Sequence, residues 1–198
     1  MTPSHPARQQ ARRQQIRLAL AVVRWTLRFY REHLVLVMGL SLIASAQRAT
    51  AQLWGDQLPA WSGPAGEALT GLVRVVLFVA VLRIAILGDE HVRRALDDDG
   101  WRRIRAFARH AWPSLGVQLL LFAALFTVVD IIPDLVIAPR VPAPAQPAYW
   151  AALLAVKNPT VIALSMIWQI GAARQALLLG GAARAQRAGA AVEAPAPR

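Results

Sequence analysis

The sequence contains no cysteine, which excludes disulfide bonds, iron–sulfur clusters and thiol chemistry. It also contains a single lysine, Lys157, among 22 basic residues, so its positive charge is almost entirely arginine. Charged residues make up only 17% of the 198 residues, whereas about 25% is usual in soluble domains. A chain with so few charges lacks the polar surface that an ordinary soluble domain needs.

Catalytic signatures are also missing. The sequence has no nucleophile elbow, no glycine-rich phosphate loop and no HExxH motif. His91 and the aspartates at 97–99 lack a recognisable metal-ligand spacing, and His33 and His110 lie where histidine is easily tolerated at a membrane interface. We therefore expect no catalytic residue, no metal site and no cofactor, and we expect that the protein is not an enzyme.

Nucleic-acid binding is not expected either, although the formal net charge is +11. The arginines lie beside apolar runs, and no hydrophilic segment is long enough to form a nucleic-acid-binding domain. Hydrophobic residues instead account for 56% of the chain, and the mean hydropathy is +0.39. Apolar composition together with clustered arginine is typical of a membrane protein with basic cytoplasmic edges.

The longest apolar run, Ala111–Val129, carries no charged residue. As a helix it would extend roughly 28 Å, close to the thickness of the hydrocarbon core of a bilayer. Three further apolar runs have a similar pattern. The sequence therefore predicts an all-α fold, a four-helix transmembrane bundle within residues 16–181, with spans at about 34–54, 67–88, 111–131 and 159–180.

The first of these spans has a competing interpretation. A basic stretch followed by a short apolar run and Ala44-Ser45-Ala46 resembles a signal peptide with its cleavage site. Against that interpretation, the preceding basic region is long and itself half apolar. The two ends of the chain, residues 1–15 and 182–198, are predicted to be disordered. Residues 130–158 are predicted to form the longest loop, because the stretch contains five prolines and regular helix is not expected in its first half.

The distribution of arginine predicts how the chain is threaded. Arginines concentrate before the first predicted span, between the second and third, and after the fourth, whereas the other two connections carry few basic residues. By the positive-inside rule, both termini are expected in the cytoplasm. The abundance of Ala, Gly, Pro and Arg suggests a bacterial genome, so we expect a multi-pass protein of the cell inner membrane.

Two segments, Ile16–Arg31 and Trp101–His110, place arginines on one helical face and apolar residues elsewhere. This pattern is typical of a helix lying in the membrane interface, and for Ile16–Arg31 it also fits a cytoplasmic extension of the following span. The sequence thus predicts two tandem helical hairpins, each preceded by a basic interfacial helix. The two halves resemble each other either because the segment was duplicated or because both cytoplasm-to-membrane junctions need the same types of residue. The candidate contacts to anionic lipid headgroups are Arg17, Arg24, Arg28, Arg31, Arg102, Arg105 and Arg109.

Polar side chains inside the predicted spans are the candidate functional residues, because burying them in a bilayer is costly. Arg74 and Asp130 are predicted to pair across helices, with Arg48 nearby toward the outer side. The pair would be either a substrate or headgroup site or a structural ion pair of the bundle. Gln118 and Gln169 are expected to form interhelical hydrogen bonds.

The sequence favours a non-enzymatic accessory or scaffold protein whose partners are anionic membrane lipids. Its further partners would be a larger membrane complex or other copies of the chain. The first alternative is a small oligomeric transporter or channel that uses the polar residues of the outer half. The second alternative is a membrane enzyme acting on lipids.

Overall fold

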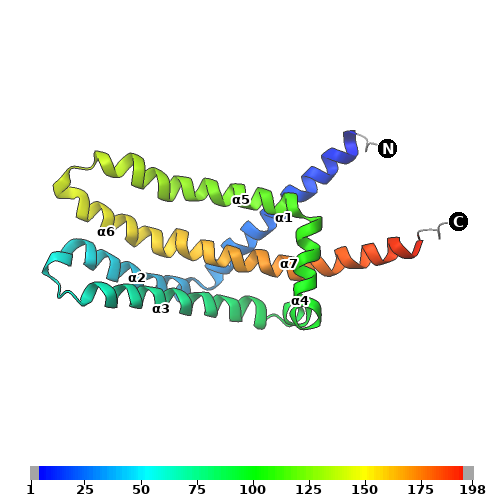
Figure 1. Cartoon of the computed structure of the whole chain (residues 1–198), viewed down its shortest axis with the longest axis horizontal. Coiled ribbons are helices and arrows are strands. Elements are labelled where there is room, and N and C mark those ends of the chain that lie inside the picture. Colours follow the sequence, from blue (N-terminus) through cyan, green and yellow to red (C-terminus); the bar gives the residue numbers. More distant parts are fainter. Residues whose placement is uncertain (1–4, 194–198) are drawn as a thin grey trace. The chain divides into compact units, whose positions relative to one another are not determined.

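The computed structural model describes residues 5–193, and every regular element in that range is helical (Figure 1). Four helical segments are long and apolar enough to cross a membrane: Leu34–Gln57, Ser62–Leu87, Trp112–Arg140 and Ala143–Ala182. The predicted all-α class with four long apolar helices is therefore confirmed. Residues 1–4 and 194–198, which belong to the predicted disordered tails, lie outside the described residues.

Within the described residues, seven α-helices are joined by short 3₁₀-helical and π-helical elements and by turns. The α-helices are α1 (His5–Glu32), α2 (Leu34–Trp54), α3 (Ser62–Leu82), α4 (Glu90–His110), α5 (Trp112–Phe126), α6 (Gln146–Lys157) and α7 (Ala163–Glu193). The short elements are η1 (Gly55–Gln57), η2 (Arg83–Leu87), η3 (Thr127–Ile131), η4 (Pro133–Ile137), η5 (Ala138–Arg140), η6 (Ala143–Ala145) and η7 (Asn158–Ile162). Of these, η2, η3, η4 and η7 are π-helical and the others are 3₁₀-helical.

Helix extends further into both predicted tails than the sequence indicated. The helix α1 begins at His5 instead of near residue 16, and α7 continues to Glu193. Both added stretches are rich in Ala, Gln and Arg, which have high helix propensity. Lack of apolar periodicity therefore does not mark the end of the helix here.

The chain divides into two compact units, which are described separately. Unit 1 comprises Met1–Trp25, Leu82–Leu119 and Trp168–Arg198. Unit 2 comprises Thr26–Val81 and Leu120–Ile167, and it holds most of the length of the four apolar segments.

In unit 2, α2 packs closely along α6 (Figure 1). The buried residues of α2 recur at helical spacing and are mostly small: Val37, Ser41, Ala44 and Ser45. The α6 side of the contact includes the buried Ala151. Small side chains let two helix backbones approach closely, which is the usual basis of helix association in membranes.

A proline in η7 is accommodated by this contact. Pro159 has no N–H, so the carbonyl of Ala155, four residues earlier, loses its α-helical donor. The hydroxyl of Ser45 on α2 donates to that carbonyl at 3.2 Å. The hydroxyl of Tyr30 donates to the carbonyl of Pro159 itself at 2.9 Å. Side-chain hydroxyls thus satisfy backbone groups around the proline, as the interior of a bilayer requires.

Replacing Ser45 with alanine is expected to destabilise the protein by about 1 kcal/mol, because the Ala155 carbonyl loses its hydroxyl donor. The loss is expected to shrink in a Pro159→Ala background, where residue 159 again supplies an N–H. A double-mutant cycle on unfolding free energy in detergent micelles measures this coupling. Equal losses in both backgrounds would contradict the explanation.

The predicted long loop at residues 130–158 is wrong. Helical turns continue from Thr127 to Arg140 and resume at Ala143, so only Val141 and Pro142 separate the two segments. Pro133, Pro139, Pro144 and Pro147 each occupy the first or second position of a new helical element, where a missing N–H costs little. Proline therefore changes the type of helical turn here instead of ending the helix.

In unit 1, α4 contacts α7 and is bent. Phe107, Ala111 and Ala176 form a small buried cluster, with Ile104 and Leu115 packed against it. The backbone of α4 departs from helical geometry at Asp99, which places a kink within the run of aspartates. Asp89 caps the start of α4, because its carboxylate accepts hydrogen bonds from the backbone N–H groups of His91 and Val92.

Candidate functional site

Arg48, one of the predicted intramembrane residues, pairs with Glu67 of the neighbouring helix. Its two terminal nitrogens lie 2.5 and 2.6 Å from the two carboxylate oxygens of Glu67, a bidentate arrangement between α2 and α3. Such planar, two-point pairing is the strongest form of an arginine–carboxylate contact. Glu67 thus neutralises the charge of Arg48. This partner was not predicted, because Glu67 stands at the very start of the predicted span.

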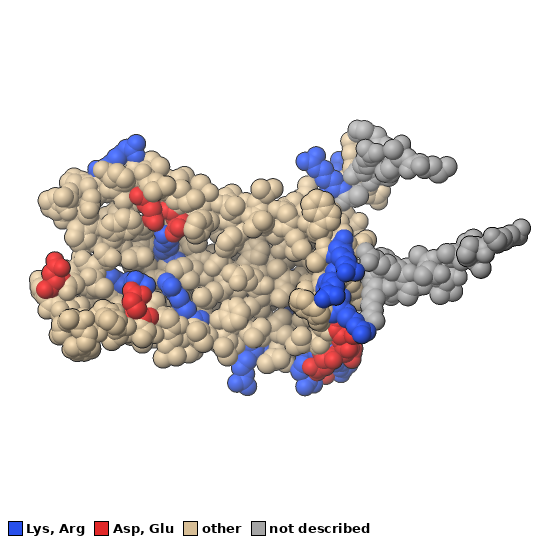
Figure 2. All heavy atoms as spheres, in the orientation of Figure 1, with Lys and Arg blue, Asp and Glu red and all other residues tan. Residues whose placement is uncertain are grey.

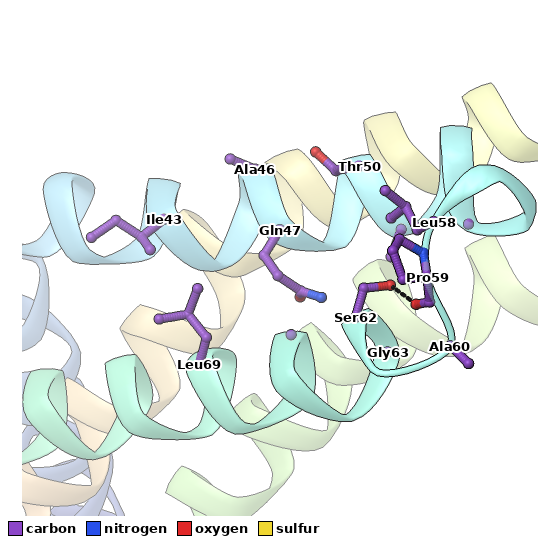
Figure 3. A pocket seen from close by; sticks show the side chains of 13 residues that line it. Ile43, Ala46, Gln47, Thr50, Leu58, Pro59, Ala60, Ser62, Gly63 and Leu69 are labelled. Carbon is purple, nitrogen blue, oxygen red and sulfur yellow. Dashed lines mark hydrogen bonds between the residues drawn. The ribbon is translucent and has the colours of Figure 1, made fainter.

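A cavity of about 770 Å³ opens between α2 and α3 next to this pair. In Figure 3, Gln47 extends from α2 toward α3, and Leu69 extends from α3 toward α2. Thr70 donates a hydrogen bond of 2.8 Å to the Gln47 side chain. The rest of the lining is mainly apolar or small, including Ile43, Leu58 and Gly66. The size is that of a small-molecule pocket, but it presents few polar groups to fix a ligand.

Asp130 does not pair with Arg74, so that prediction is corrected. The Asp130 carboxylate forms an ion pair with the ammonium group of Lys157, and Asp134 lies 3.7 Å from the same ammonium group. The Lys157 side chain is 12% exposed, whereas those of Asp130 and Asp134 are 26% and 39% exposed. One cation therefore faces two carboxylates, both supplied by the π-helical turns η3 and η4.

The physical reason for the wrong pairing is the extra helix in this region. Lys157 was predicted to lie in a loop outside the membrane. Arg74 was therefore the nearest predicted intramembrane cation that could pair with Asp130. Because the segment is helical instead, Lys157 lies on α6 within the apolar segment Ala143–Ala182. The one signal in the sequence that could have drawn attention to Lys157 is that it is the single lysine among 22 basic residues.

Arg74 contacts a neutral amide instead of a carboxylate. One terminal nitrogen of its guanidinium donates to the side-chain oxygen of Asn158 at 3.2 Å. Asn158 is only 3% exposed, and it follows Lys157 directly in the chain. Arg48, Arg74, Lys157 and their partners thus form the candidate functional site, a set of charged and polar side chains inside the apolar segments of unit 2.

The seven arginines predicted to contact lipid headgroups are all exposed: Arg17, Arg24, Arg28, Arg31, Arg102, Arg105 and Arg109. On α1 the face away from the arginines is buried within the protein, at Ala19, Val22, Thr26 and Phe29. Basic atoms also gather over α4 in Figure 2, beside acidic atoms, and they belong to arginines because the single lysine is on α6. Most of the rest of the face drawn there is uncharged, as expected of helices surrounded by lipid.

Exposed tryptophans accompany the arginines of α4. Trp101 is 68% exposed and Trp112, at the start of α5, is 69% exposed. The guanidinium of Arg105 lies over the Trp101 ring, 5.5 Å from its centroid. Tryptophan prefers the level of the lipid headgroups, so this combination of rings and guanidinium groups suits the boundary between lipid and water.

Asp89 links three helices of unit 1. Beyond capping α4, its carboxylate lies 2.5 Å from a terminal nitrogen of Arg174 on α7. The guanidinium of Arg174 in turn lies 5.7 Å from the centre of the Trp25 ring on α1. The hydrogen bond from Arg174, aided by the backbone donors of His91 and Val92, holds the pKa of Asp89 below its ordinary value.

Acid is therefore expected to weaken unit 1. Because the folded-state pKa of Asp89 is lowered, its stabilising effect is complete above the unfolded-state pKa of about 4 and is lost as pH falls through the folded-state pKa. Asp89→Asn should make thermal stability less dependent on pH between pH 5 and pH 3. Asp97→Asn, at an exposed position on the same helix, is the matched control and should keep the wild-type dependence.

Glutamine side chains also connect the helices of unit 1. The buried Gln118 donates to the side-chain oxygen of Gln175 at 3.3 Å, and Gln175 donates to the backbone carbonyl of Leu18 at 2.8 Å. The predicted interhelical hydrogen bonding of Gln118 is thus confirmed, with Gln175 as its partner. Gln169, its expected counterpart, is exposed.

Among the described residues, no three His, Cys, Asp or Glu side chains lie together in a way that could hold a metal ion. The His33 ring contacts the Phe29 ring at a tilt of 54°, with ring centroids 4.4 Å apart, and His110 is exposed. No protein-family model, curated protein or solved structure matches the chain.

Proposed function

We propose that the chain is a non-enzymatic accessory or scaffold protein of a bacterial inner membrane. In this proposal both termini are cytoplasmic, and the four spans form two tandem hairpins, each preceded by a basic interfacial helix. The arginines of α1 and α4 bind the headgroups of anionic phospholipids. The observation that carries the proposal is the exposure of all seven of these arginines.

Lipid binding by α4 is supported by the contrast between its two halves. In the first half, Arg93 and Arg94 both pair with Glu90, at 2.6 and 2.9 Å. In the second half, Arg105 and Arg109 have no acidic partner within ion-pair distance among the described residues, and Arg102 reaches Asp99 only at 3.6 Å. Guanidinium groups without an acidic partner among the described residues, as in Arg105 and Arg109, suit phosphate oxygens, each contributing about 1 kcal/mol.

An accessory role is supported by the polar groups within the spans. Arg48 pairs with Glu67, and Lys157 pairs with Asp130, so these charges stabilise the packing of helices against one another. The segment Trp112–Arg140 is largely exposed, because only 6% of its most apolar 18-residue stretch is buried. Its exposed apolar side chains are available to lipid or to helices of a larger complex.

Replacing Arg102, Arg105 and Arg109 with glutamine is expected to weaken binding of anionic phospholipid roughly 100-fold, at about 1 kcal/mol per arginine. Native mass spectrometry of protein purified from vesicles containing phosphatidylglycerol measures the retained lipid. The matched control is Arg93→Gln with Arg94→Gln, on the same helix, which should retain lipid as the wild type does. Equal retention by the triple variant would refute the lipid contact.

The transporter alternative is favoured by one observation, the presence of Lys157, Asp130 and Asp134 together inside apolar segments. Purification in mild detergent followed by reconstitution into vesicles separates the two functions. An accessory protein should co-purify with other membrane proteins and leave ion flux at the level of empty vesicles. A chain that purifies alone and raises flux, with the flux lost in the triple variant Lys157→Met, Asp130→Asn and Asp134→Asn, would replace the proposal by the alternative.

A further inference from the structure

Arg74 is a cation at the centre of a membrane span without a carboxylate partner. It lies near the middle of the 26-residue segment Ser62–Leu87. On α3 it follows Thr70 by four residues and precedes Leu77 by three, so it shares the face formed by these buried side chains. In the described residues no acidic side chain lies within ion-pair distance of it. A charge at this depth is costly unless it is paired.

The neighbouring acidic groups already have partners. Glu67 holds Arg48 through both of its oxygens. Asp130 and Asp134 both face Lys157. The single hydrogen bond that the structure gives Arg74 goes to the neutral amide of Asn158, at 3.2 Å. Among the described residues, no carboxylate therefore forms a direct ion pair with Arg74.

The two residues joined by this hydrogen bond each keep an unused donor. The Nε–H of Arg74 is buried and has no hydrogen-bond partner, and the same holds for the side-chain NH₂ of Asn158. The amide cannot be turned around to correct this, because its oxygen is needed to accept from the guanidinium. Buried donors without acceptors are rare, and both of these call for an acceptor atom.

We infer that Arg74 and Asn158 form a binding site for a small monovalent anion. Its chemistry is that of a halide or of a short carboxylate such as formate, which would accept hydrogen bonds from Arg74 Nε and from the amide of Asn158. An anion satisfies both donors and the unpaired charge together, whereas a water molecule would satisfy only the donors. The inference goes beyond the proposed function and does not depend on it.

Thermal unfolding of the full chain in detergent tests the site. Sodium gluconate, whose anion is too large for such a site, is replaced stepwise by sodium chloride or sodium formate at constant ionic strength. Above the dissociation constant, each tenfold rise in the concentration of the free anion that binds should raise the melting temperature by about 3–5 °C. A response to chloride alone identifies a halide site, and a response to formate alone identifies a carboxylate site.

Two variants and a control make the result specific. Arg74→Gln should abolish the response, while Arg83→Gln, at an exposed position on the same segment, should keep it. Asn158→Asp places a carboxylate beside Arg74, so it should fold and be stable in gluconate without added small anion. The inference is overturned if the wild type shows no anion response, if Arg74→Gln keeps it, or if Asn158→Asp responds as the wild type does.

Discussion

Replacing Lys157 with methionine is expected to destabilise the protein by about 3 kcal/mol and to lower its yield in the membrane. The substitution keeps the length of the side chain but leaves Asp130 and Asp134 inside apolar segments without their shared cation. Removing one partner of a largely buried ion pair is far more costly than the pair's net contribution, because the remaining charge stays desolvated. Reversible unfolding in mixed micelles measures the loss.

The explanation requires that the cost comes from the stranded carboxylates. A triple variant, Lys157→Met with Asp130→Asn and Asp134→Asn, should therefore recover most of the lost stability. Lys157→Arg should also be tolerated, since it keeps the charge. If the triple variant is no more stable than Lys157→Met, the loss reflects packing of the lysine side chain, and the ion-pair account of this site fails.

Replacing Gly180 with valine is expected to separate α7 from α4 and to destabilise the protein by about 3 kcal/mol. A Cβ atom at Gly180 would collide with the backbone carbonyl of Arg103, and backbone cannot move aside as a flexible side chain can. Overpacking of a tight contact typically costs about 1–3 kcal/mol, and here the obstacle is rigid. Thermal unfolding together with cysteine cross-linking between α4 and α7 measures the effect.

Gly71 offers the matched control for this prediction. It lies within the spanning helix α3, and a Cβ atom there meets nothing within 4 Å. Gly71→Val should therefore leave stability within about 0.5 kcal/mol of the wild type, because valine has a higher helix propensity than glycine and points into open space. Equal losses at the two positions would show that the size of the new residue, and not the α4–α7 contact, determines the outcome.

The existence of four helices long and apolar enough to span a membrane could be predicted because it depends on little more than local composition. A run such as Ala111–Val129 needs only its apolar length to indicate a span. Capping by Asp89 was predictable for a similar reason, since the residue and the donors it serves are adjacent in the sequence. Properties that depend on nearest neighbours in the chain were thus accessible from the sequence.

The ion pairs were not accessible, because they depend on how helices face one another. Asp130 lies in the π-helical turn η3, and each such turn shifts the face on which later residues lie. The prolines that follow suggested a loop, which moved Lys157 out of the membrane in the prediction. Because the loop was predicted wrongly, Asp130 was assigned the wrong partner. Arg74 was likewise assigned an acidic partner, whereas in the structure it contacts the amide of Asn158.

The hydrogen bond between Ser45 and Ala155 also has a consequence for synthesis. Its two residues are 110 positions apart, so α2 must enter the membrane long before α6 exists. At about 5–20 residues per second, the ribosome needs on the order of 5–20 s to close that gap. During this interval the face of α2 that carries the small residues Ser41, Ala44 and Ser45 lacks the helix α6 on which it packs. Completion of unit 2 is therefore timed by translation, and a chain that stalls before α6 leaves an incomplete first span for membrane proteases to remove.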